Sequence, residues 1–180
     1  QICQGGFLTG MVATAMANAA IADTVRVLTA LAGTRPVGWH TRSTPSPNTR
    51  RLLIEEGGFL YDSDDYSDDL PFFVAVENRR HLVLPYSFDT NDMHFHQGFH
   101  RFVTAADFTE YVGDAFDALW EEGARTPKMM SIGLHLRMIG RPGRIAALDR
   151  VIRHMKAKGG VWFATRRQIA EHWIARFPEK

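Results

Sequence analysis

One histidine stands where an apolar run gives way to a loop rich in glycine and arginine. His135 follows Leu134 at the end of the run 129–134, and the loop 140–144 comes soon after it. Side chains at the carboxyl end of a buried strand lie where α/β sheets bind ligands. An imidazole can donate a proton to a leaving group near neutral pH. The pattern predicts a general acid, although a histidine that only hydrogen-bonds a nearby loop explains it equally well.

A second candidate segment covers residues 38–42, again where a short strand gives way to a loop. Trp39 could form the floor of a pocket for a flat or ring-shaped ligand. Arg35 or Arg42 could hold an anionic or carbonyl group of that ligand. The residue types alone favour the simpler account, in which Trp39 fills the core and both arginines lie on the surface.

Two acidic segments invite metal hypotheses. The run 62–69 contains five aspartates, but an EF-hand counted from Asp62 has Ser67 in place of glycine and Phe73 in place of the final glutamate. We therefore expect a solvated loop there, with Asp62, nearest the strand end, pointing into the site. In the run 89–96, His94 and His96 would share one face of an extended segment. No third ligand follows at a recognisable spacing, so a metal site is not predicted.

Hydrophobic periodicity and capping residues predict alternating helices and strands. The expected apolar helix faces include Val25 with Leu28 and Leu31, and Ile145 with Leu148, Ile152 and Met155. This alternation indicates one α/β domain with a largely parallel sheet. The helices are expected at 11–31, 46–57, 104–123, 144–158 and from 165 onward, and the strands at 36–40, 59–61, 72–76, 81–86, 128–135 and 161–164.

Bulk composition narrows the class of protein. The 180 residues suffice for one domain, and a formal net charge of +1 offers no basis for binding nucleic acid or an anionic membrane. The uncharged stretch 1–22 is interrupted by polar and small residues, so neither a secretory signal nor a membrane span is expected. The single cysteine, Cys3, excludes an internal disulfide and fits a reducing cytoplasm. A chain that begins at Gln1 also fits an incomplete or processed product.

Several segments taken together resemble the polysaccharide deacetylase superfamily, and within it the branch of the cofactor-independent allantoinases. They occur in the family's order, and the resemblance extends from about residue 34 to the C-terminus. It implies a distorted (β/α) barrel and hydrolysis of C–N bonds in amides or cyclic ureides. No cofactor is implied for this branch, whereas the deacetylases use a divalent metal such as zinc. The segments are 35–39, 48–52, 55–64, 68–71, 89–92 and 134–144.

The resemblance also implies roles for single residues. The leucine–histidine motif makes His135 the general acid, and the arginine–proline motif at 35–39 lines the cleft. The acidic motif at 89–92 braces that cleft. The substrate, a small molecule, would then be bound by Arg35, Trp39, Arg42, Asp62, Asp89 and Asp92.

The chain departs from the family pattern at its start. The family's paired aspartates and metal-binding histidines precede the matched region, yet residues 1–33 contain a single acid, Asp23, and no histidine. We therefore expect an atypical helical segment at 1–33, followed at 34–180 by part of a barrel that lacks its N-terminal strands. An open sheet edge would favour a homo-oligomer. Three functions stay open: an allantoinase-like hydrolase, a metal-dependent deacetylase of N-acetylated carbohydrate, and a catalytically incomplete member that only binds ligand or partner.

Overall fold

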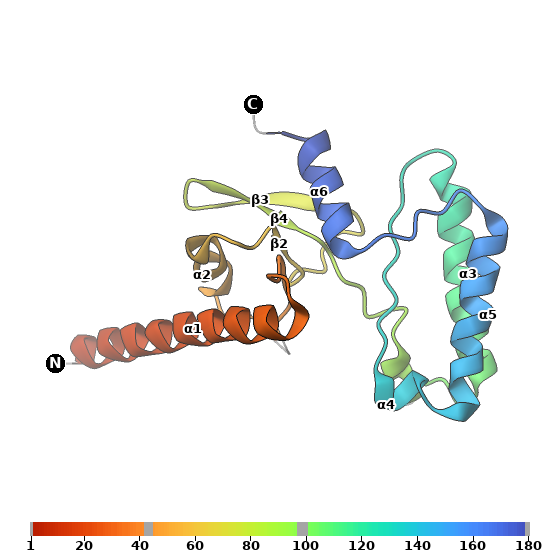
Figure 1. Cartoon of the computed structure of the whole chain (residues 1–180), viewed down its shortest axis with the longest axis horizontal. Coiled ribbons are helices and arrows are strands. Elements are labelled where there is room, and N and C mark those ends of the chain that lie inside the picture. Colours follow the sequence, from red (N-terminus) through yellow and green to blue (C-terminus); the bar gives the residue numbers. More distant parts are fainter. Residues whose placement is uncertain (1, 42–44, 97–100, 179–180) are drawn as a thin grey trace. The chain divides into compact units, whose positions relative to one another are not determined.

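The computed structural model describes residues 2–41, 45–96 and 101–178 (Figure 1). These residues form two compact units. The first unit comprises residues 1–85 together with 164–180, and the second comprises residues 86–163. The α/β class expected from the sequence is confirmed, because the chain combines a four-stranded sheet with helices. In the described residues, strands and helices alternate only as far as residue 62, and only helices follow the last strand. The division expected at residue 33 stays a prediction, since the compact units separate at other positions.

The first unit is built on a four-stranded sheet with the order β1-β2-β4-β3. The strands are β1 (Gly38–Trp39), β2 (Tyr61–Asp62), β3 (Phe72–Val76) and β4 (Arg79–Val83). β1, β2 and β4 run parallel, whereas β3 and β4 form an antiparallel hairpin from the two strands expected at 72–76 and 81–86. The parallel strands therefore direct their carboxyl ends, at residues 39, 62 and 83, toward one edge of the sheet.

Three helices complete the first unit: α1 (Ile2–Ala32), α2 (Thr49–Glu56) and α6 (Arg166–Arg176). α1 packs on α2 through Ile21, which forms a small core with Leu52 and Leu53. The predicted apolar face of α1 is confirmed at Val25, which is buried, and wrong at Leu28 and Leu31, which are exposed. Residues 15–32 are also long and apolar enough to cross a membrane, a property that buried core helices and signal sequences share.

The start of α2 also differs from the prediction. Ser46 does not cap the helix: its backbone carbonyl accepts from Thr49 N, and its hydroxyl lies 3.0 Å from that of Thr49. These bonds close a turn before the helix, so that Asn48 occupies the N-cap position. The predicted end is confirmed, since Gly57 adopts a left-handed conformation with φ of 86° that suits glycine.

The second unit pairs two long helices, α3 (Ala105–Gly123) and α5 (Pro142–Lys158), which lie side by side in Figure 1. Two short helices also belong to this unit: η1 (Asp92–Phe95) precedes α3, and α4 (Leu136–Ile139) lies between α3 and α5 along the chain. The helix expected from residue 104 is confirmed, and a capping box of Thr104 and Asp107 opens it. The core between the helices contains Phe95, Phe108, Val112, Phe116, Ile139, Ala147, Val151 and Met155.

The buried face of α5 and the segment 161–164 both differ from what the sequence predicts. Ile145 and Ile152 are exposed, because the helix turns Ala147 and Val151 toward α3 instead. The predicted strand 161–164 belongs to no sheet of the described chain. It follows Gly159 and Gly160, whose positive φ values of 70° and 68° break the extended conformation.

The predicted strand 128–135 is reduced to one bridge. Its only β-pairing among the described residues is the parallel bridge of Gly133 with Asn91. On either side of the bridge, side chains bond to backbone groups that a longer strand would pair with another backbone. Thr90 Oγ1 donates to Ser131 O, and Asp92 Oδ2 accepts from His135 N. The segment is therefore tied to its neighbour by side chains more than by a ladder.

Candidate active site

His135 and Asp92 form the most distinctive polar pair of the second unit. The distance from His135 Nδ1 to Asp92 Oδ1 is 2.7 Å. Asp92 opens η1 and is fully buried, whereas 29% of the His135 side chain is exposed. An ionised carboxylate accepts hydrogen bonds only, so the imidazole donates from Nδ1 and keeps Nε2 for other chemistry.

The second oxygen of Asp92 is equally engaged. Asp92 Oδ2 accepts from the backbone N–H of His135 at 2.7 Å and from that of Ile139 at 3.2 Å. One carboxylate therefore holds the backbone of His135, its ring and the last turn of α4. Three donors directed at a buried carboxylate satisfy it, so that its burial does not leave an unpaired charge.

The bridge beneath this pair keeps it in place. Asp92 N donates to Gly133 O at 2.9 Å, and Gly133 N donates to Thr90 O at 3.0 Å. Gly133 permits this close approach, because a Cβ there would come within 2.3 Å of Asn91 Nδ2 and 2.2 Å of the Tyr86 hydroxyl. The glycine at position 133, within the apolar run and two residues before His135, is therefore required for steric reasons.

Asp89 lies apart from the pair. Its exposed carboxylate accepts a hydrogen bond from the Tyr111 hydroxyl, and this bond raises the pKa of Tyr111. His94 Nε2 lies 3.1 Å from the Phe88 carbonyl, and its ring stands edge-on to Phe102. Of the residues singled out in this acidic motif, the structure brings only Asp92 to His135.

A different polar cluster lies at the carboxyl end of β2 in the first unit. Asp62 is buried there, and its carboxylate accepts from Arg50 Nε at 2.6 Å and from Arg50 Nη2 at 3.1 Å. His81 Nε2 lies 3.0 Å from Asp62 Oδ2, although it is poorly aligned for a hydrogen bond. Sequence reasoning missed both Arg50 and His81. A histidine in the apolar run 81–84 was the available signal, because a buried polar side chain needs a partner.

The surroundings of Asp62 perturb its ionisation. Burial alone would raise the pKa of Asp62, but His81, Arg50 and the backbone N–H of Asp64 together lower it to about 2. A carboxyl group whose pKa is lower in the folded than in the unfolded state stabilises the fold above its unfolded pKa. That contribution is lost as the pH falls through the folded pKa.

This shift predicts how stability depends on pH. We expect the wild-type chain to lose about 2 kcal/mol of Asp62-derived stability between about pH 5 and pH 2. An Asp62→Asn variant cannot ionise at this position and should show a flatter profile over that range. Urea unfolding at pH 6, 4, 3 and 2 measures the difference. Parallel profiles for the two chains would show that Asp62 does not contribute this stability.

The loops that follow β1 and β2 are joined by hydrogen bonds to Asp64. Asp64 Oδ1 accepts from Thr41 N at 2.6 Å and lies 3.2 Å from His40 Nδ1. Thr41 in turn accepts from Trp39 Nε1 at 2.9 Å. Trp39 also packs edge-on against Phe59 beside the core of α1 and α2, as the simpler sequence account expects.

Arg35 lies at the other end of the strands. It precedes β1, and its guanidinium pairs with Glu56, which precedes β2. The structure therefore places Arg35 at the amino ends of these strands, whereas Asp62 follows at their carboxyl ends. Arg42 lies outside the described residues. Substrate-binding roles for Arg35, Trp39, Arg42, Asp62 and Asp89 stay predictions.

The described residues do not assemble a metal centre. Among them, no group of three or more histidine, cysteine, aspartate or glutamate side chains is arranged to hold an ion. His135 and Asp92 bond each other, and His94 contacts a carbonyl group.

Comparison with known proteins identifies relatives. No protein-family model matches the chain. Over 160 residues it is 41% identical to a Schizosaccharomyces pombe protein named provisionally as a polysaccharide deacetylase, a match that covers 81% of this chain and 49% of that protein.

Solved structures give the same picture. The chain matches the crystal structure of Puue allantoinase with a TM-score of 0.84 and 52% identity, covering 91% of this chain and 54% of that one. It matches a Pseudomonas aeruginosa PAO1 protein, named provisionally as a polysaccharide deacetylase, with a TM-score of 0.81 and 54% identity. That match covers 88% of this chain and 53% of the other. The chain thus spans about half the length of the relatives it matches.

Proposed function

We propose that this chain, which belongs to the polysaccharide deacetylase family, acts in the hydrolysis of a non-peptide C–N bond. The proposed substrate is a cyclic ureide such as allantoin. The Asp92–His135 pair is the observation that carries this proposal. The 52% identity to Puue allantoinase supports the choice of a ureide.

The proposed chemistry uses His135 as a general acid. Water adds to the carbonyl carbon of the ring amide, the C–N bond then breaks, and the leaving nitrogen takes a proton from His135 Nε2. Asp92 accepts from Nδ1 and so directs Nε2 toward the leaving nitrogen. The ring donates in its imidazolium form, which carries a proton on both nitrogens, and becomes the neutral imidazole when Nε2 gives its proton up. The group that activates the water is not assigned to any described residue.

Ring opening of allantoin tests the proposal directly. We expect the chain to hydrolyse allantoin in the presence of chelator and His135→Ala to lower turnover by about 10²-fold or more. His154→Ala provides a matched control, because His154 lies 2.8 Å from Asp117 in a second His–Asp pair, which is partly exposed. It should leave turnover unchanged. Equal activity in the wild-type and His135→Ala chains would exclude the proposed role.

The second candidate is a metal-dependent deacetylase of N-acetylated carbohydrate, supported by the names of the S. pombe and P. aeruginosa relatives. It predicts release of acetate from an N-acetylated glucosamine oligomer, lost on chelation and restored by zinc. The third candidate is binding without catalysis. Saturable allantoin binding without turnover of either substrate would favour it. A homo-oligomer and a cytoplasmic location stay predictions.

A further inference from the structure

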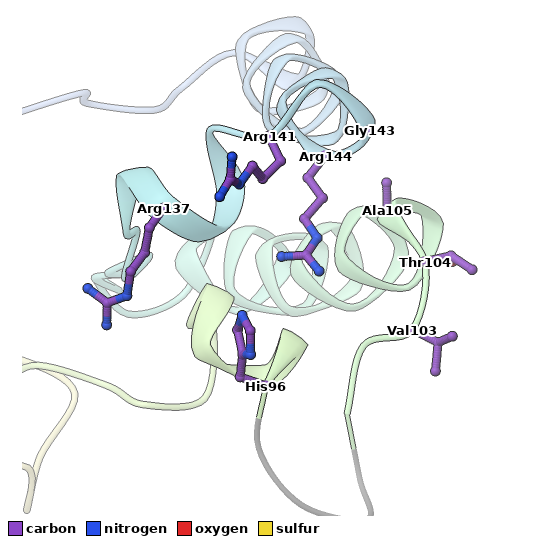
Figure 2. A pocket seen from close by; sticks show the side chains of 8 residues that line it. All are labelled: His96, Val103, Thr104, Ala105, Arg137, Arg141, Gly143 and Arg144. Carbon is purple, nitrogen blue, oxygen red and sulfur yellow. The ribbon is translucent and has the colours of Figure 1, made fainter.

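A pocket with an unusual lining lies in the second unit, between the end of η1, the start of α3 and the start of α5 (Figure 2). Its volume is about 470 Å³. Neither His135 nor Asp92 contributes to the lining, so the pocket is separate from the pair proposed for catalysis. The lining residues are His96, Val103, Thr104, Ala105, Arg137, Arg141, Gly143 and Arg144.

Positive charge dominates this lining. Three arginines and a histidine contribute to it, and no aspartate or glutamate does. None of the three arginines forms an ion pair with a carboxylate of the described residues, unlike Arg50 with Asp62 or Arg153 with Asp149. Neighbouring guanidinium groups without a carboxylate repel one another, and a bound anion would relieve that repulsion.

The acid nearest in sequence to this lining is already engaged. Asp107 Oδ2 accepts from the backbone N–H groups of Val103 and Thr104, at 2.7 and 2.8 Å. These bonds cap the start of α3 and lower the pKa of Asp107. Its carboxylate is therefore directed at backbone donors and forms no ion pair with the arginines.

Arg144 is held in position before any ligand binds. Its guanidinium lies over the Phe95 ring, 4.2 Å from the centroid, and its Nη1 donates to the Met138 carbonyl at 3.4 Å. Figure 2 shows the side chains of Arg144 and His96 directed toward each other, with Arg137 farther out. A guanidinium fixed in this way loses little conformational freedom when it binds, and its planar donors match two oxygens at once.

We infer that this pocket binds an oxyanion, the phosphate or carboxylate group of a small molecule. Arg144 and Arg141 supply the principal donors, and His96 adds a further polar contact. Gly143, in the first turn of α5, places no side chain in the space, and a Cβ there would meet nothing within 4 Å. This binding is independent of the hydrolase activity proposed above, and it can be measured without turnover.

Titration calorimetry at constant ionic strength tests the inference with inorganic phosphate in one arm and acetate in the other. We expect saturable binding of at least one of them and no saturable heat with chloride. Phosphate alone would identify a phosphoryl ligand, and acetate alone a carboxylate ligand. No saturable binding of either anion would overturn the inference, whatever the chain does to allantoin.

Matched variants locate the binding. Arg144→Met should weaken it by about tenfold or more, in line with one lost charge-assisted bidentate contact. Because Arg144 also contacts Phe95, the exposed Arg141→Met supplies a second variant that leaves the core untouched, and thermal melts confirm that both chains fold. Arg150→Met alters an exposed arginine of α5 outside the lining, so it is the control and should bind as the wild type does. An equal loss in all three variants would show general charge attraction and overturn the assigned site.

Discussion

In an Asp92→Asn chain, turnover is expected to fall by about 10³-fold. Its free energy of unfolding is expected to fall by about 2–4 kcal/mol. The carboxylate accepts from three N–H groups, two of the backbone and one of the His135 ring. An asparagine has one oxygen, so its amide N–H₂ must face at least one of those donors. The imidazole then loses the partner that orients it, and a buried polar group stays unsatisfied.

Urea unfolding and the allantoin assay measure these two losses separately. Asp117→Asn is the matched control, because it alters an Asp–His pair whose carboxylate is partly exposed. It should change the unfolding free energy by less than about 1 kcal/mol. If Asp92 acts through His135, adding His135→Ala to Asp92→Asn should cost little further turnover. Unaltered turnover in Asp92→Asn, or fully additive losses in the double variant, would contradict that coupling.

A Phe108→Ala chain is expected to lose about 3–5 kcal/mol of its free energy of unfolding. Phe108 is fully buried on α3, and its ring stacks on Phe95 with centroids 6.0 Å apart and meets Phe102 edge-on at 5.9 Å. Removing the ring leaves a cavity where the core of the second unit supports η1. Since η1 begins at Asp92, the Asp92–His135 pair should become less ordered as well.

Phe163→Ala is the control for this change. It removes the same side chain from the same unit, but 53% of Phe163 is exposed. Its loss should stay below about 1 kcal/mol, because little apolar area returns to water. The two variants are compared by their denaturant midpoints, provided that the free energy of unfolding depends on denaturant concentration with the same slope in both. A Phe108→Ala chain no less stable than Phe163→Ala would mean that the α3–α5 core does not stabilise this unit.

Local chemistry explains which features could be predicted from the residues. The capping boxes at Thr104 with Asp107 and at Thr165 with Gln168 are both present, since each depends on residues three apart. Gly57 ends its helix for a similarly local reason. The hairpin follows from alternation within one short stretch. The resemblance to a family also pointed to Asp92 and to His135, in two separate motifs that are each only a few residues long, but it did not predict that the two side chains pair.

Tertiary structure decided what depends on partners distant in sequence. Asp92 meets His135 across 43 positions, Arg50 and His81 gather on Asp62 from another helix and strand, and nothing local specifies either group. The segment 128–135 has an apolar pattern suited to a strand, yet only Gly133 pairs. Pattern predicts that a segment prefers to be extended and buried. Which backbone and side-chain groups satisfy its hydrogen bonds is determined only when the chain brings distant donors and acceptors together.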